Sequence, residues 1–228
     1  MSEESKPRSP GCLSRIFSLF LFLAAVGLFV ALYFVAQPQD LSDIKGYGSS
    51  KPPRDLTLAL RNAQERGYPL TISEEDLNTW LSHTLEAKQG GVLGSKVELK
   101  GVAIRLEKDR AEVILERTIF GKPFTSSMYV RIEKLETSAG RETLVHRDGG
   151  EFVKDLPRLK KGGRLGRLVV PQGVLVLLLP SFGDLKTQFS SEIELAVESM
   201  ARVTIEDDKL ELDPREPGES DGLLPGTF

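Results

Sequence analysis

Cysteine, histidine and tryptophan are all scarce in this chain of 228 residues, and each scarcity excludes a class of protein. The single cysteine, Cys12, cannot form an internal disulfide, so no disulfide framework holds the fold together. The two histidines, His83 and His146, are far apart, and neither belongs to a cluster with the spacing of metal ligands. One tryptophan and a net charge of −3 argue against a nucleic-acid partner, which usually needs stacking aromatics or a basic surface.

Sequence motifs of common enzymes are also missing. There is no Gly-x-Ser-x-Gly nucleophile motif, and the basic stretch "KKGGRLGR" lacks the Gly-Lys-Ser/Thr ending of a phosphate-binding loop. The carboxylates in "SEED" and "EDD" are explained by a helix cap and a tight turn. We therefore expect a protein that is not an enzyme and that needs no cofactor and no metal ion.

One long hydrophobic run lies near the N-terminus. Ile16 to Ala36 contains 21 residues without a charge, which as a helix matches the ~30 Å hydrocarbon core of a bilayer. A signal peptide has a shorter apolar region, of about 7–15 residues, and cleavage after Ala36 would place Phe34 where small residues are favoured. The run therefore predicts an uncleaved transmembrane helix.

The charges beside this helix indicate its orientation. The N-terminal flank carries Lys6, Arg8 and Arg15, whereas the other flank begins with Asp40 and Asp43. Because positive charges favour the cytoplasmic side, we expect a single-pass protein of the inner or plasma membrane with an extracytoplasmic (periplasmic) C-terminal domain. The expected organisation is a cytoplasmic tail (1–15), the transmembrane helix (16–36), a flexible linker rich in Pro, Gly and Ser (37–54), an α+β domain (55–213) and a disordered tail (214–228).

Three amphipathic helices are expected in the domain. The first covers residues 55–66 and ends at Gly67, although its "LTLAL" also fits a strand. The second begins with a capping box at Ser73–Asp76 and carries an apolar face that includes Trp80 and Leu81. The third is a helix of about five turns from Phe182 to Met200, preceded by a second capping box at Ser181.

A second apolar block, Leu168 to Leu179, follows the basic stretch directly. Its 12 residues are too few to span a bilayer, and they include Pro171 and Gln172. We expect a buried helix that begins at Pro171 and is ended by Pro180.

Apolar residues alternate with period two between the second helix and the basic stretch, as in β-strands. The alternation slips near Lys100–Gly101, which indicates a β-bulge. A hairpin is expected from "ETLVHR" and "EFVKDL" around "DGG", and a last one around Asp207–Asp208. This antiparallel meander has one apolar face, which needs a cover. The residues expected to share a face are Ala111, Val113 and Leu115 in one strand and Phe124, Ser126, Met128, Val130 and Ile132 in the next.

The order of these segments resembles the YpmS-like family of bacterial membrane-anchored extracytoplasmic proteins and, more distantly, the LmeA-like lipid-binding proteins. The resemblance covers most of Leu70–Leu212 and includes the patterns T-x-S-E-x-x-L-N and L-G-x-L-x-x-P, which are packing and capping signals. It implies an α+β fold in which a curved antiparallel sheet is packed on amphipathic helices, related to tubular lipid-binding folds. It also implies lipid binding, and it supplies no catalytic residue.

Two functions are compatible with such a domain. If the helices do not fill the curved sheet, an apolar groove remains for a lipid tail, and basic residues meet the lipid headgroup; the basic stretch also fits a solvated connection. The alternative is a tethered protein–protein interaction module in envelope assembly, with a filled core and an envelope protein as partner. The expected groove residues are Trp80, Leu81, Met128, Phe182, Leu185 and Phe189, and the expected headgroup residues are Arg158, Lys160, Lys161, Arg164 and Arg167.

Overall fold

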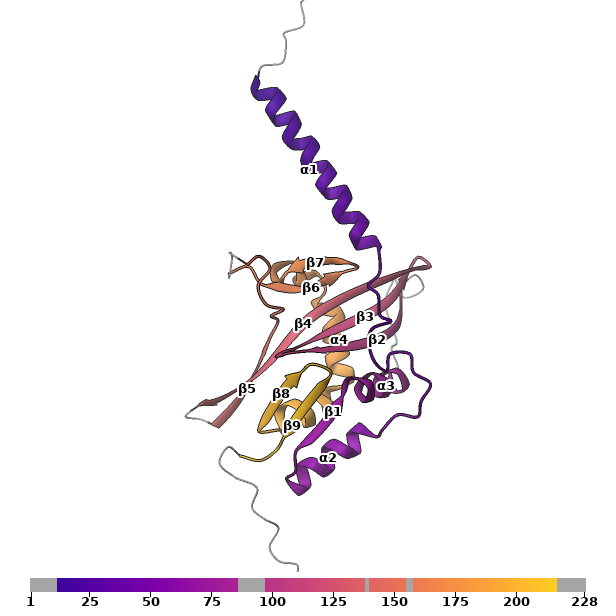
Figure 1. The fold of residues 1–228 in the computed structure, drawn as a ribbon, viewed down its shortest axis with the longest axis vertical. Coiled ribbons are helices and arrows are strands. Elements are labelled where there is room, and N and C mark those ends of the chain that lie inside the picture. Colours follow the sequence, from indigo (N-terminus) through magenta and orange to yellow (C-terminus); the bar gives the residue numbers. More distant parts are fainter. Residues whose placement is uncertain (1–11, 86–96, 138–139, 155–157, 217–228) are drawn as a thin grey trace, which may run out of the picture.

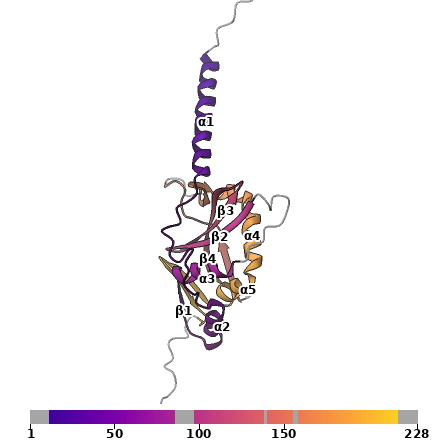
Figure 2. The same ribbon diagram turned by 90° about the vertical axis from the view of Figure 1, so that its right-hand side faces the viewer.

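Helix α1 (Cys12–Ala36) projects from the rest of the structure and contacts it only at its C-terminal end. The computed structural model describes residues 12–85, 97–137, 140–154 and 158–216. Within α1, Leu13–Ala36 is long and apolar enough to cross a membrane, and the domain covers none of its apolar window. Figures 1 and 2 show the helix projecting from one end of the domain. It begins at Cys12, earlier than the expected Ile16, and most of both expected tails lies outside the described residues.

The other described residues form an α+β domain, as expected, with helices packed on open antiparallel sheets. In chain order its elements are α2 (Leu56–Arg66), β1 (Leu70–Ser73), α3 (Glu74–Thr84), β2 (Val97–Glu107), β3 (Arg110–Ile119), β4 (Lys122–Thr137), β5 (Gly140–His146), β6 (Lys161–Leu165), β7 (Leu168–Pro171), the 3-10 helix η1 (Gln172–Leu177), α4 (Leu179–Gln188), α5 (Ser190–Ile193), the π-helical turn η2 (Glu194–Glu198), β8 (Arg202–Glu206) and β9 (Lys209–Asp213).

Two sheets make the framework of the domain (Figure 1). The six-stranded sheet has the order β2-β3-β4-β6-β7, and β5 pairs with the C-terminal half of the long strand β4. The three-stranded sheet has the order β1-β9-β8. A register shift between Leu99 and Gly101 confirms the predicted bulge, and the β8–β9 pair confirms the predicted hairpin around Asp207–Asp208.

The predicted glycine end of α2 and the predicted Ser73 cap of α3 are confirmed. The Asp55 side chain accepts a hydrogen bond from the Leu58 N–H at 2.9 Å, and α2 ends at Gly67, whose φ of 65° suits glycine. Ser73 Oγ accepts a hydrogen bond from the Asp76 N–H at 3.0 Å at the start of α3. These caps satisfy N–H groups that a helix cannot pair internally.

The six-stranded sheet has an inner face, which carries Val113 and Met128, and an outer face, which carries Ile114 and Tyr129. On the inner face lie the helices and the smaller sheet. On the outer face lie residues 39–47 of the expected flexible linker, and its later residues run beside α3, where Lys51 pairs with Glu75. Figure 2 shows α4 and α5 on one side of the sheet and this segment on the other. The segment packs against the domain: the Gln39 N–H donates to Thr125 Oγ1 at 2.8 Å, and Ile44 is buried against Ile114. Apolar contact therefore orders a stretch whose composition is typical of a flexible linker.

Side chains of α3 close the free edge of β2. Asn78, fully buried, donates from Nδ2 to the Ile104 carbonyl and accepts the Ile104 N–H at Oδ1, both at 2.7 Å. Glu74 Oε2 accepts the Leu106 N–H at 2.7 Å, and its Oε1 accepts the Lys45 N–H at 3.1 Å. Glu74 and Asn78 are the Glu and Asn of the T-x-S-E-x-x-L-N pattern. They pair an edge strand that would otherwise expose its backbone groups.

The expected buried helix from Pro171 to Pro180 is confirmed only in part: residues 172–177 form the 3-10 helix η1, in which Leu175 is buried but Val176 is 64% exposed. Leu168–Pro171 is strand β7, paired with β6, and η1 follows it before α4 begins at Leu179. A short apolar run does not by itself distinguish a strand from a helix. Leu168–Pro171 is a strand because it pairs with β6. Pro180 lies in the first turn of α4, where its missing N–H is not needed, so it starts a helix instead of ending one.

The expected five-turn helix from Phe182 to Met200 is divided into three pieces. α4 ends at Gln188, α5 begins at Ser190, and the backbone of Phe189 between them leaves the helical region (φ −111°, ψ 30°). The predicted capping box at Ser181 is also wrong, because α4 starts two residues earlier without a side-chain cap. The predicted hairpin around "DGG" does not form either: β5 pairs with β4, and Glu151 makes only an isolated bridge to Lys160.

Candidate functional site

A cavity of about 600 Å³ lies between the inner face of the six-stranded sheet and the helices. Its walls come from β2, β3, β4 and β5 on one side and from α2, α3, α4, α5 and η2 on the other, and β1, β8 and β9 also contribute. The lining is almost entirely apolar. All six expected groove residues line this one cavity: Trp80, Leu81, Met128, Phe182, Leu185 and Phe189.

The cavity exists because the helices do not reach the middle of the sheet. Val113, Met128 and Val130 lie on central strands under the helices, yet each is only half-buried. Side chains at such positions are normally fully buried in a close-packed core. Their exposed surface faces the cavity.

The cavity opens between β5 and the segment from α4 to η2. Three of its lining residues are exposed and mark this opening: Val145, which is 56% exposed, Lys186 and Glu198. Beside it, the Lys134 ammonium donates to Thr143 Oγ1 at 2.6 Å and to the Val197 carbonyl, so it joins β4 and β5 to η2. Burial lowers the pKa of this ammonium.

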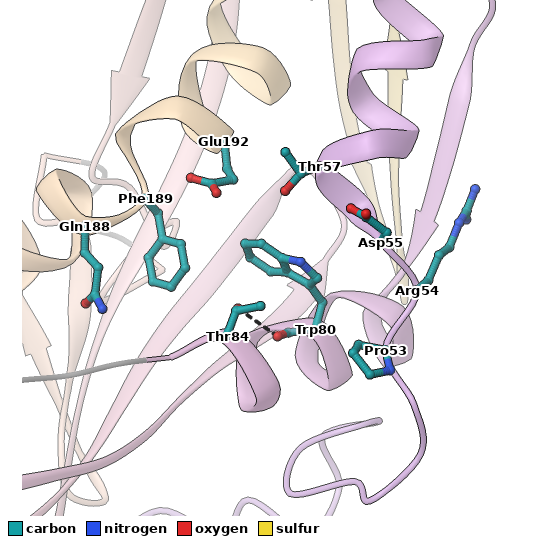
Figure 3. A pocket seen from close by; sticks show the side chains of 9 residues that line it. All are labelled: Pro53, Arg54, Asp55, Thr57, Trp80, Thr84, Gln188, Phe189 and Glu192. Atoms are coloured by element: carbon teal, nitrogen blue, oxygen red, sulfur yellow. Dashed lines mark hydrogen bonds between the residues drawn. The ribbon is translucent and has the colours of Figure 1, made fainter.

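Trp80 and Phe189 separate the cavity from a polar cleft on the surface (Figure 3). Their ring centroids are 5.6 Å apart, and both residues line both hollows. The cleft is bounded by the N-terminus of α2, by Thr84 on α3 and by Glu192 on α5. Trp80 therefore lies where a ligand in the cavity would contact it, close to solvent on its other side.

The expected headgroup residues do not converge on the cavity. Arg164 belongs to β6 and lies on the outer face, where its guanidinium contacts Tyr129 Oη at 3.1 Å and lies 3.4 Å from the fully buried carboxylate of Glu112. The basic stretch is thus a strand and not a flexible connection. The outer face and the inner face are separated by the sheet itself, so Arg164 cannot touch a lipid tail in the cavity.

The remaining basic residues of this group are also placed elsewhere. Arg167 lies in the β6–β7 turn next to the end of α1: its N–H donates to the Phe34 carbonyl at 3.0 Å and its Nη1 to Gln37 Oε1 at 3.2 Å. Lys160 pairs with Asp148 at 3.3 Å. Lys161 begins β6, and Arg158 is exposed. These basic residues are neighbours in the sequence, but they have different partners in the structure. The turn that contains Arg167 lies at the α1 end of the domain (Figure 1).

Arg117, which is not among the site residues expected from the sequence, lies on the inner face. Arg117 follows Val113 and Leu115 at the two-residue spacing of one strand face, and its Nη1 donates to Ser181 Oγ on α4 at 3.0 Å. Only the alternation around it in β3 pointed to an inward position, and an Arg near a strand end usually faces water.

Among the described residues, no group of three His, Cys, Asp or Glu side chains is arranged to hold a metal ion. His83 is exposed at the end of α3, and His146 lies 3.4 Å from Glu133 on the surface of the β4–β5 pair. Of the polar side chains in the cavity lining, Lys186 and Glu198 mark the opening, Thr143 accepts from Lys134 beside it, and Glu192 also lines the cleft next to Trp80.

Fold and site together define an α+β domain with an internal apolar cavity, joined to a helix that is apolar enough to cross a membrane. Comparisons of the chain with protein-family models, with curated proteins and with solved structures find no match. The resemblance to the YpmS-like and LmeA-like proteins therefore stays a prediction from the sequence.

Proposed function

We propose that this chain is a membrane-anchored, non-catalytic lipid-binding protein. Its single N-terminal helix crosses the inner or plasma membrane with the N-terminus in the cytoplasm, and its α+β domain, on the extracytoplasmic side, holds a lipid tail in the cavity. The observation that carries this proposal is the cavity of about 600 Å³ between the sheet and its helices.

The volume and the lining of the cavity support an apolar ligand. Small-molecule sites typically enclose about 300–1,000 Å³ and are mostly apolar. An empty cavity costs about 24 cal/mol per Å³, so about 600 Å³ corresponds to an upper limit on the order of 14 kcal/mol. That is comparable to the whole stability of a domain, about 5–15 kcal/mol. The opening beside β5 lowers this cost, but water gains little among such side chains, whereas a hydrocarbon chain fits them.

The position of the anchor supports contact between this end of the domain and the bilayer. The β6–β7 turn is hydrogen-bonded to the last turn of α1, so Arg167 lies where the helix leaves the membrane. A cation near an anionic lipid surface contributes about 1 kcal/mol to binding. In this proposal the basic stretch meets headgroups of the membrane, and the cavity on the other face of the sheet holds the bound lipid.

Trp80 provides the test, because it is the only tryptophan of the sequence and lines the cavity. It belongs to α3, in the half of the domain further from α1 (Figure 1). The full chain would be reconstituted in nanodiscs whose phosphatidylcholine carries bromine atoms on its acyl chains, which quench tryptophan fluorescence on contact. We expect quenching of Trp80 relative to nanodiscs of unbrominated lipid.

A matched control places the tryptophan outside the cavity. In Trp80→Phe/Tyr68→Trp the reporter lies at Tyr68, a partly exposed residue beyond the end of α2 that does not line the cavity. This variant is expected to show no quenching. Equal fluorescence of Trp80 in brominated and unbrominated nanodiscs would contradict lipid binding in the cavity.

The second candidate is a tethered protein–protein interaction module. One observation favours it: the β4–β5 pair extends beyond the rest of the domain (Figure 1) and exposes one large apolar side chain on each of its faces, Leu135 on β4 and Val145 on β5. Exposed apolar side chains on a projecting strand pair offer a surface on which a partner can pack. In this alternative the inner face is filled by movement of the helices, and Trp80 stays unquenched.

A further inference from the structure

A polar cleft of about 610 Å³ lies on the outer face of the six-stranded sheet, on the opposite side from the apolar cavity. Its lining consists of three arginines, three acidic residues and one glutamine, which come from the chain after α1, from β2, from β6 and from the β6–β7 turn. Two of the expected headgroup residues, Arg164 and Arg167, are among them. Such a lining suits a charged ligand and not an acyl chain.

The cleft is held next to the end of α1. Gln39, which lines it, lies three residues after this helix, and the Arg167 N–H donates to the Phe34 carbonyl at 3.0 Å. The neighbouring Gly166 has a φ of 54°, and a Cβ there would lie 2.4 Å from the Val35 carbonyl oxygen, so the β6–β7 turn packs closely on the helix end. Figure 1 shows this turn beside the end of α1. Because the polar layer of a bilayer extends about 5–8 Å from its hydrocarbon core, lipid headgroups reach the cleft if α1 crosses the membrane.

The two arginines on the strands of the cleft are compensated by carboxylates. The fully buried Glu112 lies behind the cleft, with its carboxylate 2.6 Å from the guanidinium of Arg105 and 3.4 Å from that of Arg164. Asp43 pairs with Arg105 from the other side at 3.0 Å. Two guanidinium groups therefore face two carboxylates, and this part of the cleft is neutral.

One cation and one carboxylate remain. The exposed Arg167 donates from Nη1 to Gln37 Oε1 at 3.2 Å, and Asp40 accepts the Ser42 N–H at 3.0 Å, but neither has an ion-pair partner in the described part of the chain. Glu107, the last acid of the lining, is paired with the arginine that begins β3. Hydrogen bonds from Ser42 chiefly lower the pKa of the Asp40 carboxyl, and the charge of Arg167 lowers it further, so Asp40 is ionised at neutral pH.

The side chain of Gln39 also has no partner. It is 7% exposed, and neither its amide nitrogen nor its amide oxygen forms a hydrogen bond with the described residues. The backbone N–H of Gln39, and not its side chain, ties this segment to Thr125. Buried polar side chains are almost always hydrogen-bonded, so an unpartnered amide in the wall of the cleft indicates a polar partner that binds there.

We infer that this cleft binds the zwitterionic headgroup of a phospholipid in the leaflet around the end of α1. The phosphate contacts Arg167 and the free Nη1 of Arg164, and the ammonium contacts Asp40. Guanidinium groups suit phosphate oxygens, and the carboxylate accepts from an ammonium of the phosphoethanolamine type. An anionic headgroup without an ammonium leaves Asp40 unpaired. The inference rests on the proposed membrane anchor, is independent of the apolar cavity, and adds a ligand class to the outer face.

The experiment compares phospholipids that differ only in the headgroup. The full chain, purified and delipidated in detergent, is titrated with phosphatidylethanolamine or with phosphatidylglycerol of the same short acyl chains, and native mass spectrometry counts the bound lipids. Phosphatidylglycerol has the phosphate but no ammonium. We expect phosphatidylethanolamine to bind about 5-fold more tightly, as for one exposed ion pair.

Two exposed residues of the cleft provide the variants, and their folding is checked by the emission of Trp80. Asp40→Asn should abolish the preference without weakening the binding of phosphatidylglycerol. Arg167→Gln should weaken the binding of both lipids by a similar factor, about 5-fold. Arg158→Gln is the matched control, because Arg158 is an exposed arginine of the same basic stretch that does not line the cleft; it should change neither affinity.

The outcomes separate this inference from the proposed function. Equal affinity for the two lipids in the wild type, or a preference that persists in Asp40→Asn, overturns the headgroup site. Quenching of Trp80 by brominated acyl chains tests the cavity and should be the same in the wild type and in Asp40→Asn. Absence of quenching together with an intact preference overturns the cavity alone, and equal affinities together with normal quenching overturn the headgroup site alone.

Discussion

Filling the cavity from the sheet side separates the lipid-binding proposal from its rival most directly. Val113 lies at the centre of β3, lines the cavity and is only half-buried. The next residue, Ile114, points to the outer face and is fully buried against Ile44 and Ala103. The same substitution, to phenylalanine, therefore tests a hollow site and a filled site at adjacent positions of one strand.

The two variants should change stability in opposite directions. Val113→Phe adds roughly four carbon-sized groups at about 0.8 kcal/mol each, so it gains up to about 3 kcal/mol if the cavity accommodates the ring. The loss of side-chain freedom lowers this gain, and we expect about 1–2 kcal/mol. Ile114→Phe overpacks a closed cluster, which typically costs about 1–3 kcal/mol.

Urea denaturation of the full chain in nanodiscs, followed by the fluorescence of Trp80, measures both changes. Val113→Phe should raise the midpoint and reduce quenching by brominated lipid, because the ring occupies the volume of the lipid tail. A destabilised Val113→Phe with unchanged quenching would refute the reasoning. It would show that the inner face is filled in solution, as the interaction-module alternative requires.

Three further predictions concern stability and topology. Asn78→Ala leaves the backbone N–H and carbonyl of Ile104 unpaired and should cost about 2–4 kcal/mol in urea denaturation, whereas Ser82→Ala, on the same helix, should cost less than about 1 kcal/mol. The pKa of the Asp213 carboxyl lies below its ordinary value, chiefly because the side chain of the neighbouring arginine at position 215 donates to it; its contribution to stability is therefore present above about pH 4 and lost as the pH falls further. Asp213→Asn should accordingly be less stable than the wild type at neutral pH and equal to it in strong acid, which thermal melts at several pH values can check; a constant difference at all pH values would contradict this assignment. Cys12, the only cysteine, should react with a membrane-impermeant maleimide only after the cells are permeabilised, and labelling of intact cells would reverse the proposed orientation.

Several features of the site were predictable because they depend on local periodicity. The helical spacing of Trp80 and Leu81 and the two-residue alternation around Met128 each assigned a residue to an apolar face. Once the helices are packed on the sheet, residues of these faces meet, and all six expected groove residues line one cavity.

The position of the expected headgroup residues was wrongly predicted for a different reason. Arg164 was expected beside the lipid because it precedes an apolar block in the sequence. Its strand, β6, pairs with Ser126–Met128 of β4, and this register turns the Arg164 side chain to the outer face. The environment of Arg117 is not predictable from the sequence for a related reason: its contact on the inner face is Ser181 of α4, more than sixty residues later in the chain.

The sequence by itself determined the elements whose signals lie within a few residues of each other. These are the apolar N-terminal helix, the Gly67 end of α2, the Ser73 cap of α3, the bulge near Gly101 and the apolar faces of β3 and β4. Only the tertiary structure decided that Leu168–Pro171 is a strand, that Asn78 closes the edge of β2 and that the cover leaves a hollow. The physical reason is that strand pairing and packing volume depend on partners distant in the chain, and a local pattern of apolar and polar residues does not specify which partner arrives or how closely it packs.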